Sequence, residues 1–167
     1  GSAATIGGGI ATDITFSSVT SSGAAGDALS LALSTGSSFT VTGATTLSAM
    51  GGDGIDLSGS TGGSFSFGDV DITGLGAGTG LNLAGGDATL TMSSLDVTGT
   101  GTAGSRGIDI SGTQNGRTIT ITNGGNISAV ATGVVLGTNG AAGAAPSANF
   151  TFGGGSISGS NYALDGI

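Results

Sequence analysis

The sequence contains no cysteine, histidine or tryptophan and a single proline, and it also lacks lysine and glutamate. Without cysteine the fold cannot be stabilised by disulfides. Ten aspartates and two arginines supply all the charged side chains, for a formal net charge of −8. Glutamate and lysine are strong helix formers, whereas the abundant glycine and threonine are poor ones, so long helices are disfavoured throughout the chain.

The acidic balance argues against nucleic acid or an anionic membrane as a partner, because there is no basic stripe to neutralise phosphates. No apolar run approaches the length of a membrane span, and no signal peptide is recognisable, so we expect no membrane insertion of this segment. We interpret Gly1 and Ser2 as a cloning scar, so that a native targeting segment would have been left out.

A four-residue pattern recurs along the chain at a nearly fixed interval. Its best copy is Gly54-Ile55-Asp56-Leu57, and the first apolar residues of the copies are Leu29, Ile55, Leu81, Ile108, Val134 and Leu164. The steps between them are 26, 26, 27, 26 and 30 residues. A period in this range is typical of stacked repeat architectures.

Each repeat divides into three short strands of alternating apolar residues, separated by Gly-rich turns. The first strands carry Leu29/Leu31, Ile55/Leu57, Leu81/Leu83, Ile108/Ile110 and Val134/Leu136. The second carry Ile14/Phe16, Phe39/Val41, Phe65/Phe67, Leu90/Met92, Ile119/Ile121 and Phe150/Phe152. The third are weaker, with Leu47, Val70/Ile72, Leu95/Val97, Ile127 and Ile157.

The fold class predicted is therefore all-β, a parallel β-helix of about 26 residues per coil with three strands in each. Coiling and stacking bury the apolar faces as columns of like residues, with strands about 4.8 Å apart. We expect a right-handed coil, because crossovers between parallel strands are overwhelmingly right-handed. The glycine before each first strand is expected to form a tight corner with positive φ.

Residues 3–167 are expected to form one β-helix segment of five to six coils, with residues 1–25 as an imperfect first coil. Neither end shows a polar capping element that would protect open strand edges. We therefore expect a segment excised from a longer rod, or one that associates end to end. The long connection from Gly137 to Ala148 is expected to project as a flexible loop.

The tandem coils and polar faces resemble the right-handed β-helix of autotransporter passenger domains and large bacterial surface adhesins. Gly54-Ile55-Asp56-Leu57 and Thr118-Ile119-Thr120-Ile121-Thr122 carry this resemblance, which covers essentially the whole chain. It implies an extracellular or surface-displayed shaft for adhesion, spacing or matrix assembly, with a cell-surface, matrix or glycan receptor as partner. It transfers no functional residue.

Polysaccharide-active enzymes such as pectate lyases share the coil architecture and form an alternative. Their sites need clustered carboxylates with arginine, lysine or histidine. Asp56 and Asp109 face outward in one column with Asn82 between them, and Arg106 and Arg117 both fall in a single coil. We interpret the column as a ladder on a solvated face and expect no catalytic residue, so the chain is predicted not to be an enzyme.

Two short motifs resemble known binding sites. Residues 51–56 match half of a calcium-binding nonapeptide repeat, but Ser58 replaces the apolar residue and no tandem copy follows. Residues 99–104 match a dinucleotide-binding fingerprint, which requires a helix where a strand is expected here. We therefore expect a turn in both places, with no metal or cofactor.

The outward residues of the second strands form a regular series of hydroxyl groups. The series is Thr15, Thr40, Ser66, Thr91, Thr120 and Thr151, and beside it run Ser38, Ser64, Thr89, Thr118 and Asn149. Hydroxyl ladders on a flat β-solenoid face resemble ice-binding surfaces, although threonine is also simply favoured on the outside of a parallel sheet. Our first hypothesis is thus a non-catalytic structural or adhesive segment of a bacterial surface or secreted protein. The alternative is recognition of ice or a crystalline surface.

Overall fold

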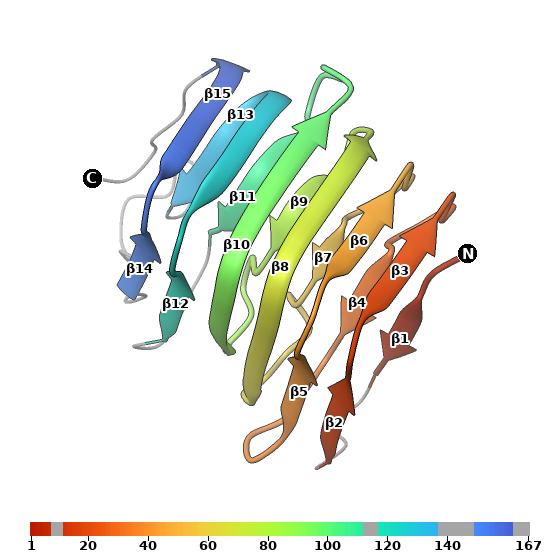
Figure 1. Cartoon of the computed structure of the whole chain (residues 1–167), viewed down its shortest axis with the longest axis vertical. Coiled ribbons are helices and arrows are strands. Elements are labelled where there is room, and N and C mark those ends of the chain that lie inside the picture. The colour runs from red at the N-terminus through yellow and green to blue at the C-terminus, as the bar shows by residue number, and fades with distance from the viewer. Residues whose placement is uncertain (8–11, 112–116, 137–148, 162–167) are drawn as a thin grey trace.

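The computed structural model describes residues 1–7, 12–111, 117–136 and 149–161. Within these ranges all regular structure is β, and the fifteen strands belong to one parallel sheet that winds into a solenoid of about five turns (Figure 1). Among the described residues there is no helix of the length and apolarity that a membrane crossing demands. The predicted fold class is confirmed.

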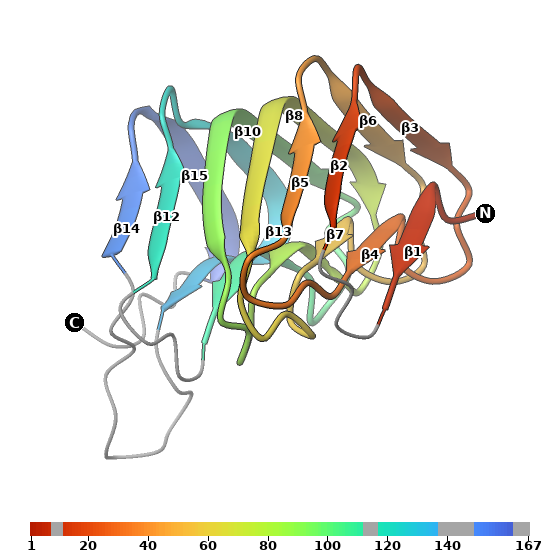
Figure 2. The ribbon, with the colours of Figure 1, turned by 90° about the horizontal axis from the view of Figure 1, so that it is seen from below.

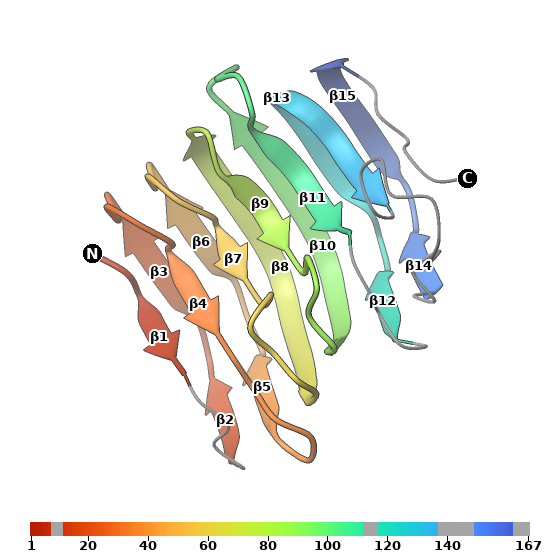
Figure 3. The ribbon, with the colours of Figure 1, turned by 180° about the vertical axis from the view of Figure 1, so that it is seen from behind.

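The first-strand stack lies at the back of Figure 1 and faces the viewer in Figure 3. It consists of β1 (Ala4–Ile6), β4 (Leu29–Leu31), β7 (Ile55–Asp56), β9 (Thr79–Asn82), β11 (Arg106–Ile110) and the end of β13 (Gly125–Leu136). Leu29, Ile55, Leu81, Ile108 and Val134 are register partners in succession, as the repeat predicts. Leu164, the last expected member, lies outside the described residues.

The other two stacks form the front of Figure 1. The second-strand stack consists of β2 (Asp13–Phe16), β5 (Ser38–Val41), the first halves of β8 (Ser64–Leu75) and β10 (Thr89–Gly99), β12 (Thr118–Ile121) and β14 (Asn149–Phe152). The third-strand stack consists of β3 (Val19–Ser22), β6 (Thr45–Ser48), the second halves of β8 and β10, the start of β13, and β15 (Gly155–Asn161).

The coil is right-handed, as expected. In Figure 1 the front strands run upward and the first-strand stack behind them runs downward, while successive coils advance from the N-terminus at the right toward the left. Seen from below in Figure 2, the three stacks surround one interior. A crossover of this hand lets right-twisted strands return to the sheet beside their parallel neighbours.

The division into three separate strands per coil holds only in part. In the third and fourth coils the second and third strands are continuous, as β8 and β10, and β13 joins a third strand to the next first strand. The reason is that the bends keep their pairing: Ser94 stays opposite Asp69 between the two halves of β8 and β10. The expected Gly-rich turns are thus absent from these bends.

The first coil is more complete than the sequence pattern indicated. Ala4 and Ile6 on β1 pair with Leu29 and Leu31, so the first-strand column begins one coil earlier than expected. Val19 on β3 pairs with Thr45 and begins the third stack. The small residue Ala4 occupies the position of Leu29, and Val19 is the single apolar residue on β3. Neither strand therefore has a pattern strong enough to recognise in the sequence.

The interior is filled by the expected apolar columns. Leu29, Ile55, Leu81 and Ile108 are fully buried, as are the third-strand residues Leu47, Ile72, Val97 and Ile127. Phenylalanines stack in the second-strand stack, with the ring centroid of Phe39 lying 5.7 Å from that of Phe16, 6.4 Å from that of Phe65 and 5.8 Å from that of Phe67. Stacked like residues of this kind supply most of the burial that stabilises a solenoid.

The glycines before the first strands do not have positive φ, so that expectation is wrong. Left-handed backbone recurs instead after the third strand, at Gly23, Ala49, Gly74 and Ala129, and it also occurs on the connections into the second strand, for example at Gly36 and Gly85. Gly54 and Gly80 are needed for space: a Cβ on Gly54 would lie 2.6 Å from the carbonyl oxygen of Gly80 and 2.7 Å from Ile72 Cδ1. The recurring glycine thus allows the next coil to approach closely, and it leaves room for a third-strand side chain such as Ile72 to pack against the glycine backbone.

Candidate functional site

The six outward residues of the second strands, here called the hydroxyl ladder, lie in a single column. Thr15 pairs in register with Thr40, Thr40 with Ser66, Ser66 with Thr91, Thr91 with Thr120, and Thr120 with Thr151. Because Cβ atoms alternate along a strand and the intervening apolar residues point inward, all six side chains point away from the core. The sequence therefore located the column correctly; whether it binds anything stays a prediction.

Beside the hydroxyl ladder runs a flanking column on the same strands. Ser38 pairs with Ser64, Ser64 with Thr89, and Thr118 with Asn149. The structure adds Asp13, which pairs with Ser38 and accepts a hydrogen bond of 2.6 Å from its hydroxyl group. The sequence series missed Asp13 because it is not a hydroxyl residue, although it stands two residues before Thr15, as Ser38 stands before Thr40.

The hydroxyl groups of the ladder are available to a ligand. None of them takes part in a side-chain hydrogen bond with another residue in the described ranges. Strands about 4.8 Å apart and residues two apart on a strand, about 6.6 Å, give a rectangular grid of polar groups. Such a grid can bind ordered water or a repetitive solid surface.

A second polar face follows the third-strand stack and was not predicted. Its outward residues are Thr20, Thr46, Asp71 and Asp96 in one column, and Ser22, Ser48, Thr73, Thr98 and Ser128 in the other. Asp96 accepts hydrogen bonds from the backbone and side-chain nitrogens of Asn126. The stacked carboxylates of Asp71 and Asp96 interrupt the hydroxyl pattern, so this face is less regular than the ladder.

The column of Asp56, Asn82 and Asp109 exists as predicted, but it is not a solvated ladder. The three residues are register partners, yet Asp109 is only 2% exposed and the other two are half-buried. Each accepts the backbone N–H two residues later, at 2.9 to 3.0 Å, in an Asx turn that ends the first strand. Arg106 donates to Asp109 and compensates its buried charge.

A second acidic column, Asp27 and Asp53, ties successive coils together at the corner before the first strand. Asp27 Oδ1 accepts the N–H of Asp53 at 2.8 Å, and Asp53 Oδ1 accepts the N–H of Thr79 at 2.6 Å. Asn82 Nδ2 donates to the other carboxylate oxygen of Asp53 at 2.7 Å. Asp53 is therefore a structural acceptor within the calcium-like motif of residues 51–56, with both oxygens already in use.

Burial raises the pKa of Asp53 above its ordinary value of 3.8, and the hydrogen bonds from Thr79 and Asn82 oppose this only in part. The charges of Asp27 and Asp56 raise the pKa further. With a pKa higher in the folded state than in the unfolded state, the folded chain binds more protons between the two values. The contribution of Asp53 to stability is therefore largest below pH 3.8 and falls as the pH rises to the elevated pKa.

We expect Asp53→Asn to remove this dependence. The unfolding free energy of the wild type minus that of the variant should decrease steadily as the pH rises above about 4. It should become constant once Asp53 is ionised in the folded state. Urea unfolding followed by far-ultraviolet circular dichroism at several pH values measures it. Parallel curves for the two proteins across the acidic range would contradict the assignment.

Arg117 also acts between coils, rather than within its own coil. Its Nε and Nη2 atoms donate to the two carboxylate oxygens of Asp87, thirty residues earlier, at 2.5 and 2.7 Å. This hydrogen-bonded pair lowers the pKa of Asp87 and raises the pKa of Arg117. The sequence could not predict the contact, because the length of the intervening connection decides which carboxylate Arg117 can reach.

In residues 1–7, 12–111, 117–136 and 149–161, no three acidic, histidine or cysteine side chains cluster as metal ligands. The dinucleotide-like residues 99–104 lead into strand β11, as expected, and no helix follows them. The Gly137 to Ala148 loop lies outside the described residues, so its expected projection stays untested.

Fold and surface together define the class of this protein: a parallel β-solenoid of about five turns with hydroxyl-rich outer faces. In comparisons with known proteins the chain matches no family model, no curated protein and no solved structure.

Proposed function

We propose that this chain is a non-catalytic structural and adhesive β-helix segment of a bacterial cell-surface or secreted protein. It is of the kind found in autotransporter passenger domains and large surface adhesins. The stacked coils act as a stiff shaft, and the polar outer faces contact a receptor. The observation that carries the proposal is the parallel pairing of all three stacks along the described coils, with register shifts after Thr98 and after Ile127.

Such pairing supports a mechanical role, because force along the axis must break inter-coil hydrogen bonds. Side chains reinforce the same direction: Asp27, Asp53 and Arg117 each bond to a neighbouring coil. Of the charged groups considered for catalysis, Arg117 bonds between coils, whereas Asp56, Asp109 and Arg106 form hydrogen bonds within one coil. The acidic composition without lysine or cysteine supports an extracellular location.

Pulling single molecules from their two ends tests the shaft. We expect unwinding one coil at a time, each step releasing about 26 residues, or about 90 Å of extended chain. The reason is that each coil contacts only its neighbours, so the terminal coil can detach while the others remain folded. Release of the whole chain in one step, or smooth extension without steps, would contradict the proposal.

The hydroxyl ladder supports a second candidate, recognition of ice or another crystalline surface. The specific observation is that six hydroxyl residues in successive strands stand in register with no side-chain bond to a described residue. A repetitive solid requires a repetitive array, and this column is the more regular of the two polar faces.

If the ladder binds ice, Thr91→Tyr or Thr120→Tyr should abolish thermal hysteresis and ice shaping, because a bulky ring prevents close approach to the lattice. Thr98→Tyr on the third-strand face is the matched control and should leave the activity unchanged. Circular dichroism verifies that all three variants stay folded. Absence of thermal hysteresis in the wild-type chain would eliminate this candidate and leave the shaft in place.

A further inference from the structure

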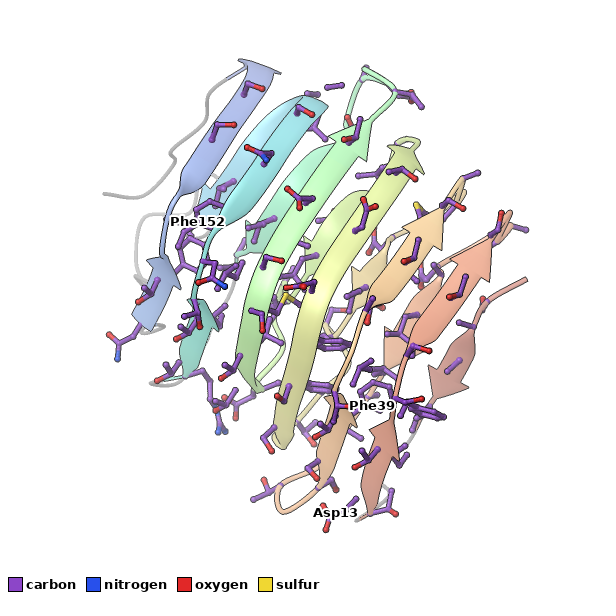
Figure 4. All side chains as sticks on the ribbon, in the orientation of Figure 1. Asp13, Phe39 and Phe152 are labelled. Atoms are coloured by element: carbon purple, nitrogen blue, oxygen red, sulfur yellow. The ribbon has the colours of Figure 1, made fainter. Side chains whose placement is uncertain are left out.

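A hollow of about 430 Å³ lies where several coils enter their second strands. It is widely open to solvent, so it is a shallow surface groove and not an enclosed pocket. The wall residues with polar side chains are Asp13, Thr35, Ser37, Ser38, Ser64 and Arg117, but carbon atoms supply more of its exposed surface than polar atoms do. In Figure 4 Asp13 stands at the foot of β2, at the outer edge of the sheet and away from the core residue Phe39.

The hollow runs along the solenoid axis, since its wall is drawn from several coils. Asp13 comes from the first coil, Ser38 from the second, Ser64 from the third, and Arg117 directly precedes β12. With strands about 4.8 Å apart, the step from Asp13 to Ser64 alone covers about 10 Å. An elongated ligand therefore fits this hollow better than a compact one.

Bare backbone forms part of the wall. Gly63 has φ +82°, a conformation that side chains rarely adopt, and a Cβ there would lie 2.9 Å from Leu33 Cβ. Glycine at this position therefore lets the chain lie close against the preceding coil, and backbone atoms of Gly63 line the hollow beside Ser64.

The charges in the hollow argue against an ionic ligand. The guanidinium of Arg117 is paired with Asp87, and Asp13 adds one carboxylate, on a chain whose net charge is −8. An anion would meet an excess of negative charge. A cation would find one exposed carboxylate already accepting a hydrogen bond from Ser38. The groups present are hydroxyl donors and acceptors, one carboxylate oxygen without a partner among the described residues, and the remaining guanidinium N–H groups.

We propose that this hollow binds a neutral glycan, with sugar hydroxyls donating to Asp13 and accepting from Arg117 Nη1. This deepens the proposed adhesive function and depends on it. Neighbouring sugar hydroxyls present donors and acceptors together, which matches a wall of mixed hydroxyl, carboxylate and guanidinium groups. A peptide is a poorer fit, because peptide recognition uses a sheet edge or apolar pockets, and the wall of this hollow has no aliphatic or aromatic side chain.

Amide chemical shifts of the ¹⁵N-labelled full chain test the proposal. The neutral probes are cellohexaose, maltohexaose and chitohexaose, and an oligogalacturonate serves as the anionic probe. We expect at least one neutral probe to shift the amides of Ser38, Gly63 and Ser64 with a dissociation constant in the millimolar range, about −4 kcal/mol. The oligogalacturonate should leave them unchanged.

Two variants and a control assign the binding to the hollow. Asp13→Asn keeps the shape and should weaken binding about tenfold, as expected for loss of a charged acceptor. Ser64→Trp fills the space and should abolish binding. Asp71→Asn removes an exposed carboxylate from the third-strand face and should change nothing.

Three results would overturn the proposal: no shift with any neutral probe at about 10 mM, shifts located elsewhere, or equal binding by the Ser64→Trp variant. The shaft is tested independently by pulling. If the chain unwinds coil by coil but does not bind these sugars, the proposed mechanical function stands and the proposed glycan binding is wrong. If the chain binds the sugars but extends without steps, the proposed glycan binding stands and the proposed mechanical function is wrong.

Discussion

Replacing Phe39 by alanine is expected to lower the free energy of unfolding by about 3–5 kcal/mol. Phe39 is fully buried, and its ring contacts those of Phe16, Phe65 and Phe67. Truncation loses the transfer energy of the ring and leaves a cavity between coils that cannot collapse, because backbone ladders fix the spacing of the strands. Tilted aromatic pairs of this kind contribute about 0.5–1.5 kcal/mol more than their buried area alone.

Phe16→Ala is the matched control, because Phe16 belongs to the same stack but is 41% exposed. Its loss should cost clearly less than that of Phe39. Urea unfolding followed by far-ultraviolet circular dichroism measures both variants. Equal losses for the two would show that the phenylalanine column does not stabilise the coil through burial.

The second large effect is expected from Gly80→Ala, which should destabilise the chain by about 1–3 kcal/mol. A Cβ at this position would lie 2.7 Å from the carbonyl oxygen of Gly107 and 2.9 Å from both Cγ atoms of Val97. The carbonyl belongs to the neighbouring coil and cannot retreat without disturbing the ladder. Relief must therefore come from separating two coils or displacing Val97 from the core.

Gly26→Ala is the control for this substitution. A Cβ on Gly26 would have no atom within 4 Å, and its φ is not positive, so alanine should be neutral or stabilise by about 0.4–1 kcal/mol. In the second coil Ala28 occupies the column of Gly54 and Gly80, and the corresponding third-strand residue is Leu47 instead of a β-branched one. If Gly80→Ala proved as harmless as Gly26→Ala, the close approach of coils would not be the reason for the recurring glycine.

Much of the architecture could be predicted because the repeat consists of apolar residues at regular positions in the sequence. Ile55, Leu81 and Ile108 recur at nearly constant spacing, and alternation inside each strand fixes which side chains point inward. The hydroxyl ladder followed from the same alternation, since Thr91 and Thr120 lie between inward residues. Periodicity cannot reveal how a corner is built: the glycines before the first strands lack the expected positive φ, which is found after the third strands and on the connections into the second strands.

Contacts between non-repeating residues were also beyond the sequence. Asp109 was expected to be solvated and is buried, with Arg106 beside it. Arg117 reaches Asp87 across a coil boundary, and Asp13 joins a hollow with Ser64. Asp87 and Arg117 lie on connections, whose length does not by itself fix where a side chain points. Arg106, Asp109, Asp13 and Ser64 lie on strands, but the repeat pattern does not show how deeply such a side chain is buried or which neighbour it meets.

The sequence by itself determined the winding of this protein: parallel coils of about 26 residues, their inward columns and their hydroxyl-bearing outer face. It could do so because every coil repeats the same binary pattern, and burying that pattern requires like residues to stack. The tertiary structure alone decided which bends remain paired, which carboxylates are buried, and where a hollow opens on the surface. Those features arise from distances between coils, which are set by packing and inter-coil hydrogen bonds rather than by any local preference of the chain.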